Sequence, residues 1–261
     1  MPQSGDILNA LQDLRFRLKM STLNLDRCIL VHQMGKVGSS TIIQSLEDLN
    51  LGTPVFHTHI LNPQRLDQKI TWKVEKSRGK LSKKEILKNG HLNISTYLIN
   101  ALQKDSTNRH WKIITLVREP VSRNISAFFQ NIDTYYENFI EQYNDGLISL
   151  KEIEEKFFNE FSHDIPLDWL DKEIKDVFGI DIYQESFPLS EGYKIYSKGN
   201  EFELMIIRME DLNRCHKDAF RQFLGIDNFS LSNKNIASDK VYSGIYNSFL
   251  RSEERRVGKE C

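Results

Sequence analysis

The chain has 261 residues, of which 39% are hydrophobic and 27% are charged, and its formal net charge is −1. This length suits one substantial α/β domain or at most two small ones, and the composition is ordinary for a globular protein. The nearly neutral charge excludes a chain-wide basic surface for nucleic acid or membranes, so we expect any anion site to be local and no nucleic-acid partner.

The spacing of apolar residues predicts an amphipathic helix over Ser4 to Met20, followed by alternating strands and helices. Helical spacing is clearest over Asn62 to Asp105 and over Leu147 to Phe178. Two late strands are expected to flank a turn at Gly199-Asn200. The predicted strands are Ile29 to Val31, Val55 to Ile60, Trp111 to Val117, Tyr193 to Tyr196 and Glu203 to Arg208. This order predicts a single α/β domain with three layers, in which helices flank a mostly parallel sheet.

The first predicted strand leads into the sequence G-K-V-G-S-S-T, Gly35 to Thr41, and then into a helix. Glycines let the backbone approach a ligand closely, and the free N–H groups at a helix start point at an anion. Lys36 adds a positive charge, and Ser39, Ser40 and Thr41 add hydroxyl donors. We therefore expect this loop to bind a phosphate-like group. A simple helix-capping role for Ser39 is compatible with that function.

The order of residues in this loop differs from that of a nucleoside triphosphate P-loop. In the P-loop, the lysine directly follows the last glycine, whereas Lys36 lies before Gly38. The third predicted strand also ends in Arg118 instead of an aspartate that could hold magnesium. No metal is therefore expected, and a nucleotide-dependent phosphotransferase stays as an alternative.

A second motif, R-E-P-V-S-R-N-I-S, runs from Arg118 to Ser126. Arg118 ends a predicted strand, and Ser126 lies two turns into the helix that follows. This geometry can bring a guanidinium group and a hydroxyl group onto one phosphate. Arg123 is a further candidate cation, and the alternative is that it faces solvent on this helix.

Together, the two motifs resemble the two cofactor motifs of sulfotransferases that use 3'-phosphoadenosine 5'-phosphosulfate. A third stretch, I-I-R-M-E-D-L ending in F-L-G at Ile206 to Gly225, is similar to another landmark of that family. The particular residues in these motifs also resemble those of bacterial capsular polysaccharide synthesis proteins. The resemblance covers the chain from about Cys28 to Gly225.

This resemblance implies a P-loop NTPase-like sulfotransferase fold. It also implies sulfuryl transfer from 3'-phosphoadenosine 5'-phosphosulfate to a hydroxyl of a glycan, as a step in capsular polysaccharide synthesis. The implied cofactor residues are Gly35, Lys36, Val37, Gly38, Ser39, Ser40 and Thr41 for the 5'-phosphosulfate, and Arg118 and Ser126, with Arg123 as a further candidate, for the 3'-phosphate. A non-catalytic capsule-assembly protein with the same fold is a second alternative.

His57 and His59 stand two residues apart on the predicted second strand, so they are expected to share a face. Sulfuryl transfer needs a base that removes the proton of the acceptor hydroxyl, and Lys36 can stabilise the charge that develops on the leaving oxygen. A similar H-x-H occurs in some polysaccharide sulfotransferases, where the second histidine is the base. His59 is therefore the favoured base, with His57 as a neighbour, and a merely packed histidine is the alternative. His91 is expected to be a cap-region residue at a helix start.

The termini and cysteines complete the predictions. Cys28, Cys215 and Cys261 are too few and too scattered for a disulfide framework or a zinc site. Without a signal-peptide pattern or a run of about 20 apolar residues, the expected location is cytoplasmic, with no transmembrane segment. Arg251 to Cys261 looks like a translated sequencing adapter, a charged natural tail being the alternative. The expected division is a helix over 1–22, a sulfotransferase-like domain over 23–250 that lacks its native carboxyl-terminal portion, and a non-native tail over 251–261.

Overall fold

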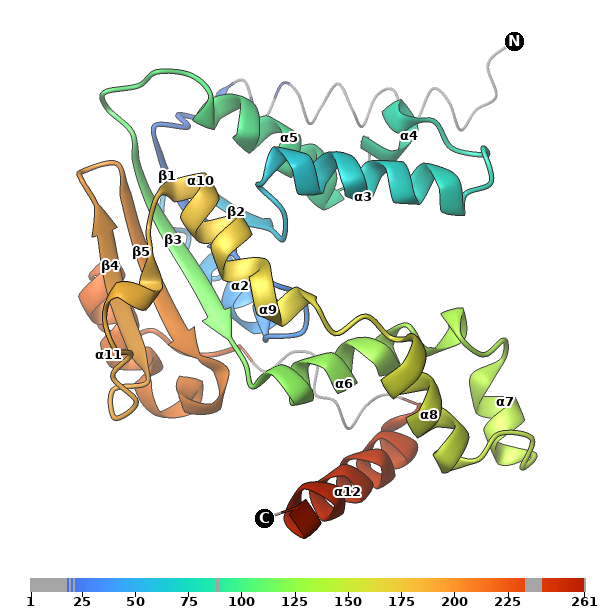
Figure 1. The fold of residues 1–261 in the computed structure, drawn as a ribbon. Coiled ribbons are helices and arrows are strands. Elements are labelled where there is room, and N and C mark those ends of the chain that lie inside the picture. The colour runs from blue at the N-terminus through green and yellow to red at the C-terminus, as the bar shows by residue number, and fades with distance from the viewer. Residues whose placement is uncertain (1–17, 19, 21, 88–89, 233–240, 261) are drawn as a thin grey trace.

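The computed structural model describes residues 18, 20, 22–87, 90–232 and 241–260. Its centre is a five-stranded sheet with the strand order β2-β1-β3-β5-β4 (Figure 1). The strands are β1 (Arg27–His32), β2 (Val55–Thr58), β3 (His110–Val117), β4 (Tyr193–Lys198) and β5 (Phe202–Arg208). All neighbouring strands are parallel except β4, which pairs with β5 in antiparallel orientation. The predicted α/β class, with a mostly parallel sheet flanked by helices, is confirmed.

The central strands are buried on both faces, as their continuous apolar runs predict. Leu30 and Val31 of β1 and the stretch 204–207 of β5 are at most 2% exposed. In the parallel register, Val31 lies opposite His57 of β2 and Ile114 of β3. Because the carboxyl ends of β1, β2, β3 and β5 therefore meet at one edge, the loops that follow these strands gather there.

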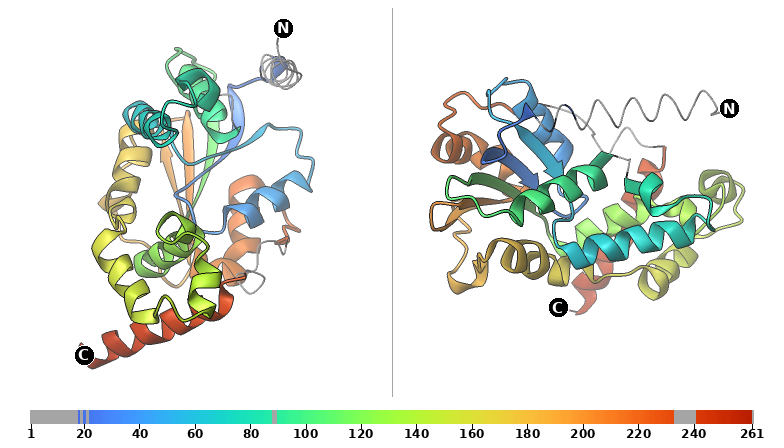
Figure 2. Two further views of the ribbon diagram at one scale, coloured as in Figure 1. Left: turned by 90° about the vertical axis from the view of Figure 1, so that its right-hand side faces the viewer. Right: turned by 90° about the horizontal axis from the view of Figure 1, so that it is seen from above.

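Helices cover both faces of the sheet, as two further views show (Figure 2). One face carries α2 (Ser39–Glu47) and α11 (Leu212–Leu224), and the other carries α5 (Gly90–Leu102) and the α9–α10 segment. This segment consists of α9 (Ile165–Leu170), the π-helical turn η2 (Asp171–Lys175) and α10 (Asp176–Phe178). The change of face between α2 and α5 is what right-handed crossovers demand when the chain reverses direction across the sheet.

The remaining helices lie beyond the carboxyl edge of the sheet or border it (Figure 1). They are α3 (Pro63–Lys76), α4 (Lys83–Leu87), α6 (Pro120–Gln130), α7 (Phe139–Asn144), α8 (Leu150–Glu160) and α12 (Ser243–Glu260), with short 3-10 turns η1 (Ile132–Thr134), η3 (Ile182–Gln184) and η4 (Met209–Asp211).

A second hydrophobic cluster joins α6, α7, α8 and α12. Phe249 of α12 is fully buried, and its ring centroid lies 5.3 Å from that of Phe129 and 5.4 Å from that of Phe157. α12 therefore packs as part of this helical lobe. The helix continues through Glu260, along most of the segment that we interpret as adapter-derived, and that interpretation stays a prediction.

Two details differ from the sequence-based expectations or fall outside the description. β2 ends at Thr58, so the prediction that the strand extends to Ile60 is wrong and His59 lies in the loop after it. The reason is a local turn in which the Ile60 amide donates to the Thr58 hydroxyl. The predicted helix from Ser4 to Met20 lies outside the described residues apart from positions 18 and 20.

Within the part of the chain that the structure describes, no helix combines the length and the apolar character needed to cross a membrane.

Candidate functional site

The loop between β1 and α2 curls tightly because two of its residues adopt left-handed backbone conformations. Gly38 has φ of 90° and is the last residue before α2, and Lys36 has φ of 73°. The first conformation favours glycine, whereas a lysine in the second is strained, a feature that often marks functional loops. The capping alternative for Ser39 is wrong, because Gly38 occupies the cap position and no side chain caps this helix.

Two arginines from the second motif donate hydrogen bonds to the backbone of this loop. Nε of Arg123 donates to the carbonyl oxygen of Gly35 at 3.0 Å, and Nη1 of Arg118 donates to that of Lys36 at 3.2 Å. Arg123 also donates to the Asn124 side chain at 2.8 Å and is 4% exposed. The solvent-facing alternative for Arg123 is therefore wrong. Burial lowers its pKa to about 10, which still leaves the guanidinium charged at neutral pH.

The start of α6 is held by carboxylates from two sides. The side chain of Glu119 accepts hydrogen bonds from the amides of Val121 and Ser122 at 2.8 and 2.6 Å, which caps the helix. The side chain of Glu210, just after β5, accepts a hydrogen bond from the Glu119 amide at 2.9 Å. The third stretch singled out in the sequence therefore supports the second motif directly.

Three histidines gather beside the loop. The ring of His57 lies 4.7 Å, centroid to centroid, from the rings of both His59 and His91, which are 5.4 Å apart. Nδ1 of His59 donates to the carbonyl oxygen of Gln33 at 2.7 Å. Burial and then the neighbouring histidines lower the pKa of His57 to about 3. Burial also lowers the pKa of His59, with the hydrogen bond to Gln33 acting against it. Both imidazoles are therefore neutral at pH 7.

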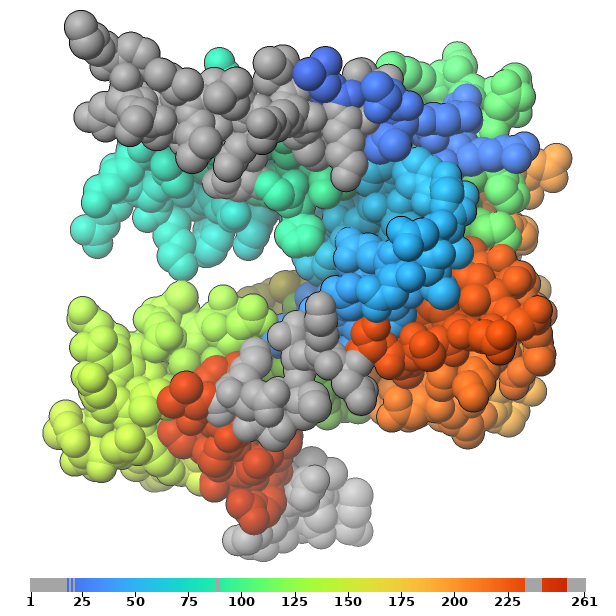
Figure 3. All heavy atoms as spheres, turned by 180° about the vertical axis from the view of Figure 1, so that it is seen from behind, coloured from blue at the N-terminus to red at the C-terminus, as the bar shows by residue number. Residues whose placement is uncertain are grey.

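A cavity of about 590 Å³ lies between this loop, the histidines and α3. Gly35, His59, His91 and Arg123 line it from the side of the sheet. The opposite wall is a stripe of α3 whose members recur at helical spacing: Arg65, Gln68, Lys69, Trp72 and Lys73. The space-filling view shows the molecule hollowed between the segment 63–87 and the lobe formed by α6–α8 (Figure 3). The cavity has the size of an ordinary ligand pocket.

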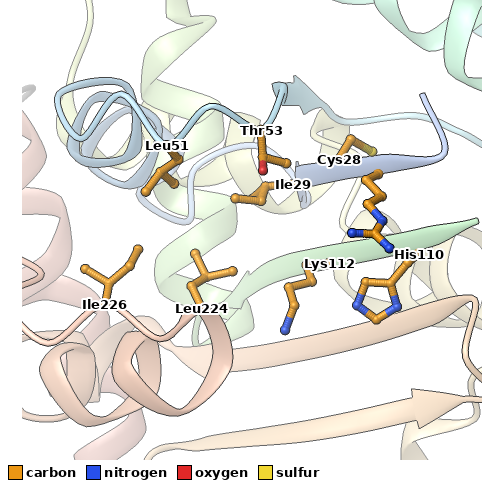
Figure 4. Close-up of a pocket in the computed structure, with 9 residues that line it drawn as sticks. Cys28, Ile29, Leu51, Thr53, His110, Lys112, Leu224 and Ile226 are labelled. Carbon is orange, nitrogen blue, oxygen red and sulfur yellow. The ribbon is translucent and has the colours of Figure 1, made fainter. Parts of the chain in front are cut away.

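A second cavity, of about 220 Å³, lies at the opposite, amino-terminal end of β1 and β3 (Figure 4). It is lined mainly by apolar side chains, and the ammonium group of Lys112 at its edge pairs with Glu203 at 2.8 Å. Burial strongly raises the pKa of the Cys28 thiol, which therefore stays protonated and unreactive. We assign this cavity no chemistry.

The structure joins some of the predicted site residues and leaves others apart. Gly35, Lys36, Arg118 and Arg123 are connected by the hydrogen bonds above, and His57 and His59 are adjacent although only His57 lies on the strand. Val37 has no exposed surface, and Ser39, Ser40 and Thr41 occupy the first turn of α2. Ser126 is half-buried on α6, and among the described residues no hydrogen bond joins its hydroxyl to the loop.

The sequence did not predict that His91 and one face of α3 contribute to the site. His91 reaches His57 only because α5 packs against β2, and nothing in the sequence near His91 signals this. The α3 stripe could have been found, because Arg65, Lys69, Trp72 and Lys73 recur at the spacing of one helix face. Helical spacing alone did not indicate that this face borders a cavity.

The comparisons with known proteins concern the carboxyl-terminal part of the chain. Residues 142–260 match the model of the NKWYS family, described as "Putative capsular polysaccharide synthesis protein". This region of the chain is therefore similar to that family. It covers β4, β5, α11 and α12 but neither the glycine loop nor the motif at Arg118 to Ser126. No curated protein and no solved structure matches the chain.

Proposed function

We propose that this protein is a sulfotransferase that moves a sulfuryl group from 3'-phosphoadenosine 5'-phosphosulfate to a hydroxyl of a glycan. The observation that carries the proposal is the pair of hydrogen bonds from Arg118 and Arg123 to the glycine loop. These bonds make the two cofactor-like motifs one structural unit beside a cavity that His59 lines. The capsule-related family match over residues 142–260 favours a polysaccharide as the acceptor.

In this proposal the 5'-phosphosulfate binds at the loop and at the start of α2, where backbone N–H groups and the hydroxyls of Ser39, Ser40 and Thr41 are concentrated. Arg118 and Ser126 bind the 3'-phosphate. Among the described residues, Arg118 donates one hydrogen bond to the loop. A guanidinium group has five N–H donors, so the others can bind a phosphate. No metal takes part in this cofactor site.

The chemistry then follows from the position of His59. The hydrogen bond to Gln33 places the proton of His59 on Nδ1, which leaves the lone pair on Nε2 to accept a proton. The acceptor oxygen forms a bond to sulfur while the bond from sulfur to the 5'-phosphate oxygen breaks. The hydroxyl proton passes to Nε2, and Lys36 stabilises the negative charge on the departing bisphosphate. His59 lines the cavity and His57 does not, which favours His59 as the base.

The wall formed by α3 suits a sugar that carries negative charge. The ammonium group of Lys69 lies 4.2 Å from the ring centroid of Trp72, and Trp72 is 48% exposed. An exposed aromatic ring next to lysines can contact the apolar face of a sugar and its carboxylate or sulfate together. We place the acceptor in this cavity.

Calorimetry with 3'-phosphoadenosine 5'-phosphate tests the cofactor site. Lys36→Ala and Arg118→Ala should each weaken binding by about 10- to 100-fold, as expected for the loss of a hydrogen bond to a charged group. Arg221→Ala is the matched control, because this exposed arginine lies on α11 and forms an ion pair with Asp218 of the same helix. Equal affinities in all four proteins would contradict the proposal.

Transfer itself is tested by incubating the protein with sulfur-labelled cofactor and a panel of capsular glycans, and then looking for labelled polymer. Cofactor binding without any transfer would favour the non-catalytic capsule-assembly alternative. Activity that requires magnesium and ATP would favour the nucleotide-dependent phosphotransferase.

A further inference from the structure

The three histidines beside the cavity come from separate parts of the chain. His57 lies on β2, His59 follows it, and His91 lies in the first turn of α5. One ring nitrogen of each histidine lies within 4.8 Å of those of the other two. No acidic or cysteine side chain belongs to this group among the described residues. The arrangement is therefore an all-imidazole cluster.

Backbone carbonyl groups fix the tautomers of two members. Nδ1 of His59 faces the carbonyl oxygen of Gln33 at 2.7 Å, and Nδ1 of His91 faces that of His57 at 3.2 Å. A carbonyl oxygen only accepts hydrogen bonds, so in the neutral form of each ring Nδ1 carries the hydrogen and Nε2 keeps its lone pair. Histidines that bind metals usually donate their second ring N–H to a carbonyl or carboxylate in this way.

The third member has a nitrogen without a partner. Nε2 of His57 is buried and makes no hydrogen bond within the described part of the chain. Leaving a buried polar atom unpaired costs about 1–3 kcal/mol. The edge-to-face packing of the imidazoles accounts for the position of the His57 ring, but it gives this nitrogen no partner. A bound ligand would supply one.

We propose that His57, His59 and His91 form a binding site for a divalent transition-metal ion of the zinc type. Three neutral imidazoles are a common donor set for zinc, which then keeps a fourth position for water or substrate. Zinc–nitrogen bonds of about 2.0–2.1 Å require the three nitrogens to lie roughly 3.4 Å apart, so nitrogens that now lie up to 4.8 Å apart must converge by up to about 1.4 Å. His91 is exposed and can supply much of this movement.

The surroundings determine the fourth ligand. His59 and His91 line the cavity, so the open position faces it, together with the positively charged Arg123 and Lys69. These charges weaken the binding of a bare cation and favour an anion, such as a carboxylate or a phosphate, as the fourth ligand. The ion would take the same Nε2 lone pair that the proposed transfer reaction needs on His59. Zinc should therefore inhibit sulfuryl transfer, and removal of zinc should restore it.

Cobalt and zinc titrations of the chelator-treated full chain test the site directly. Cys261→Ser serves as the parent protein, so that this thiol cannot bind the ion. We expect one equivalent of Co²⁺ with the visible absorption of a tetrahedral site, and displacement of Co²⁺ by one equivalent of Zn²⁺ in calorimetry. His91→Gln should weaken binding at least about tenfold. His216→Gln, on the surface of α11, should leave it unchanged.

The exposed position of His91 makes its variant decisive, because the substitution should not disturb folding. Absence of cobalt absorption in the parent protein would overturn the proposal, and so would equal affinity in the parent and His91→Gln. Binding of 3'-phosphoadenosine 5'-phosphate, measured separately on metal-free protein, tests the proposed function. The failure of one idea can thus be told from the failure of the other.

Discussion

The Nε atom of Arg123 donates a hydrogen bond to the carbonyl oxygen of Gly35, although 88 residues separate them along the chain. Gly35 follows the first strand, and Arg123 lies in the helix after the third. Together with the bond from Arg118 to Lys36, this contact fixes the anion-binding loop against α6. Two motifs that read as separate in the sequence therefore depend on each other for their shape.

The first prediction concerns this contact. Arg123→Ala should lower the free energy of unfolding by about 2 kcal/mol, because it removes a buried charged donor from two acceptors. Arg123→Lys should recover less than half of that loss, since an ammonium group cannot reproduce the planar fork. Urea denaturation measures both values. Arg221→Ala should change stability by no more than about 0.5 kcal/mol, and a comparable loss there would contradict the prediction.

The two loop glycines should respond differently to alanine. Gly38→Ala should cost about 1–2 kcal/mol of stability, because a left-handed φ of 90° disfavours a side chain. Gly35→Ala should be nearly neutral in the free protein, because its φ is not left-handed and nothing lies within 4 Å of an added Cβ. Urea denaturation gives the stabilities, and calorimetry with 3'-phosphoadenosine 5'-phosphate gives the affinities.

If the cofactor closely approaches the protein backbone at Gly35, Gly35→Ala should weaken cofactor binding while the stability of the protein stays the same. Unchanged affinity in Gly35→Ala would show that the ligand does not contact this position. A large loss of stability would mean that the loop is packed more tightly than the space around Gly35 indicates.

A buried carboxylate joins the α9–α10 segment to the start of α3. Oε2 of Glu173 accepts hydrogen bonds from the amides of Leu61 and Asn62 at 2.6 and 2.9 Å, and the residue has no exposed surface. Glu173→Ala should lower the free energy of unfolding by about 3 kcal/mol, since both amides lose their acceptor. Glu155→Ala, which removes an exposed ion pair to Lys151, should cost less than about 0.5 kcal/mol. Chemical denaturation of the two variants side by side checks the contrast.

Stability should fall as the solution is acidified. Burial, followed by the charges of His59, His91 and His32, lowers the pKa of His57 to about 3, compared with about 6.5 in the unfolded chain. The unfolded state therefore binds the extra proton, and stability is lost as pH falls from about 6.5 toward 3, by up to about 1.4 kcal/mol per pH unit.

Denaturation of chelator-treated protein at about pH 7.5 and about pH 5.5 measures this loss. His57→Gln should reduce it, although His59, whose pKa is also lowered, keeps a part. The same pH dependence in both proteins would show that His57 is not the group responsible.

The sequence was sufficient where the information is local. Continuous apolar runs located the buried strands, and the glycines at positions 35 and 38 located the loop between β1 and α2. The spacing of His57 and His59 placed them together, even though β2 ends one residue before His59. These predictions depend on periodicity and turn chemistry, which the chain carries within short segments.

The sequence was not sufficient where distant segments meet. The burial of Arg123 depends on its bond to Gly35, and an arginine in a helix gives no local sign of such a partner. His91 completes the histidine cluster only through the packing of α5 on β2. Likewise, the stripe of α3 could be recognised as one helix face, but not as the wall of a cavity.

The π-helical turn Asp171–Lys175 has a consequence for chain length. A π turn is a helix that accommodates one additional residue, so it interrupts the regular spacing between α9 and α10. Deleting one residue there would let the segment close into a continuous α-helix. The residues beyond the turn would keep nearly their present orientation, because an α-helical turn holds one residue fewer than a π-helical turn, whereas side chains inside the turn would change direction. Glu173 would then turn away from the amides of Leu61 and Asn62. Natural relatives that are one residue shorter in this turn should therefore lack a carboxylate at the position of Glu173.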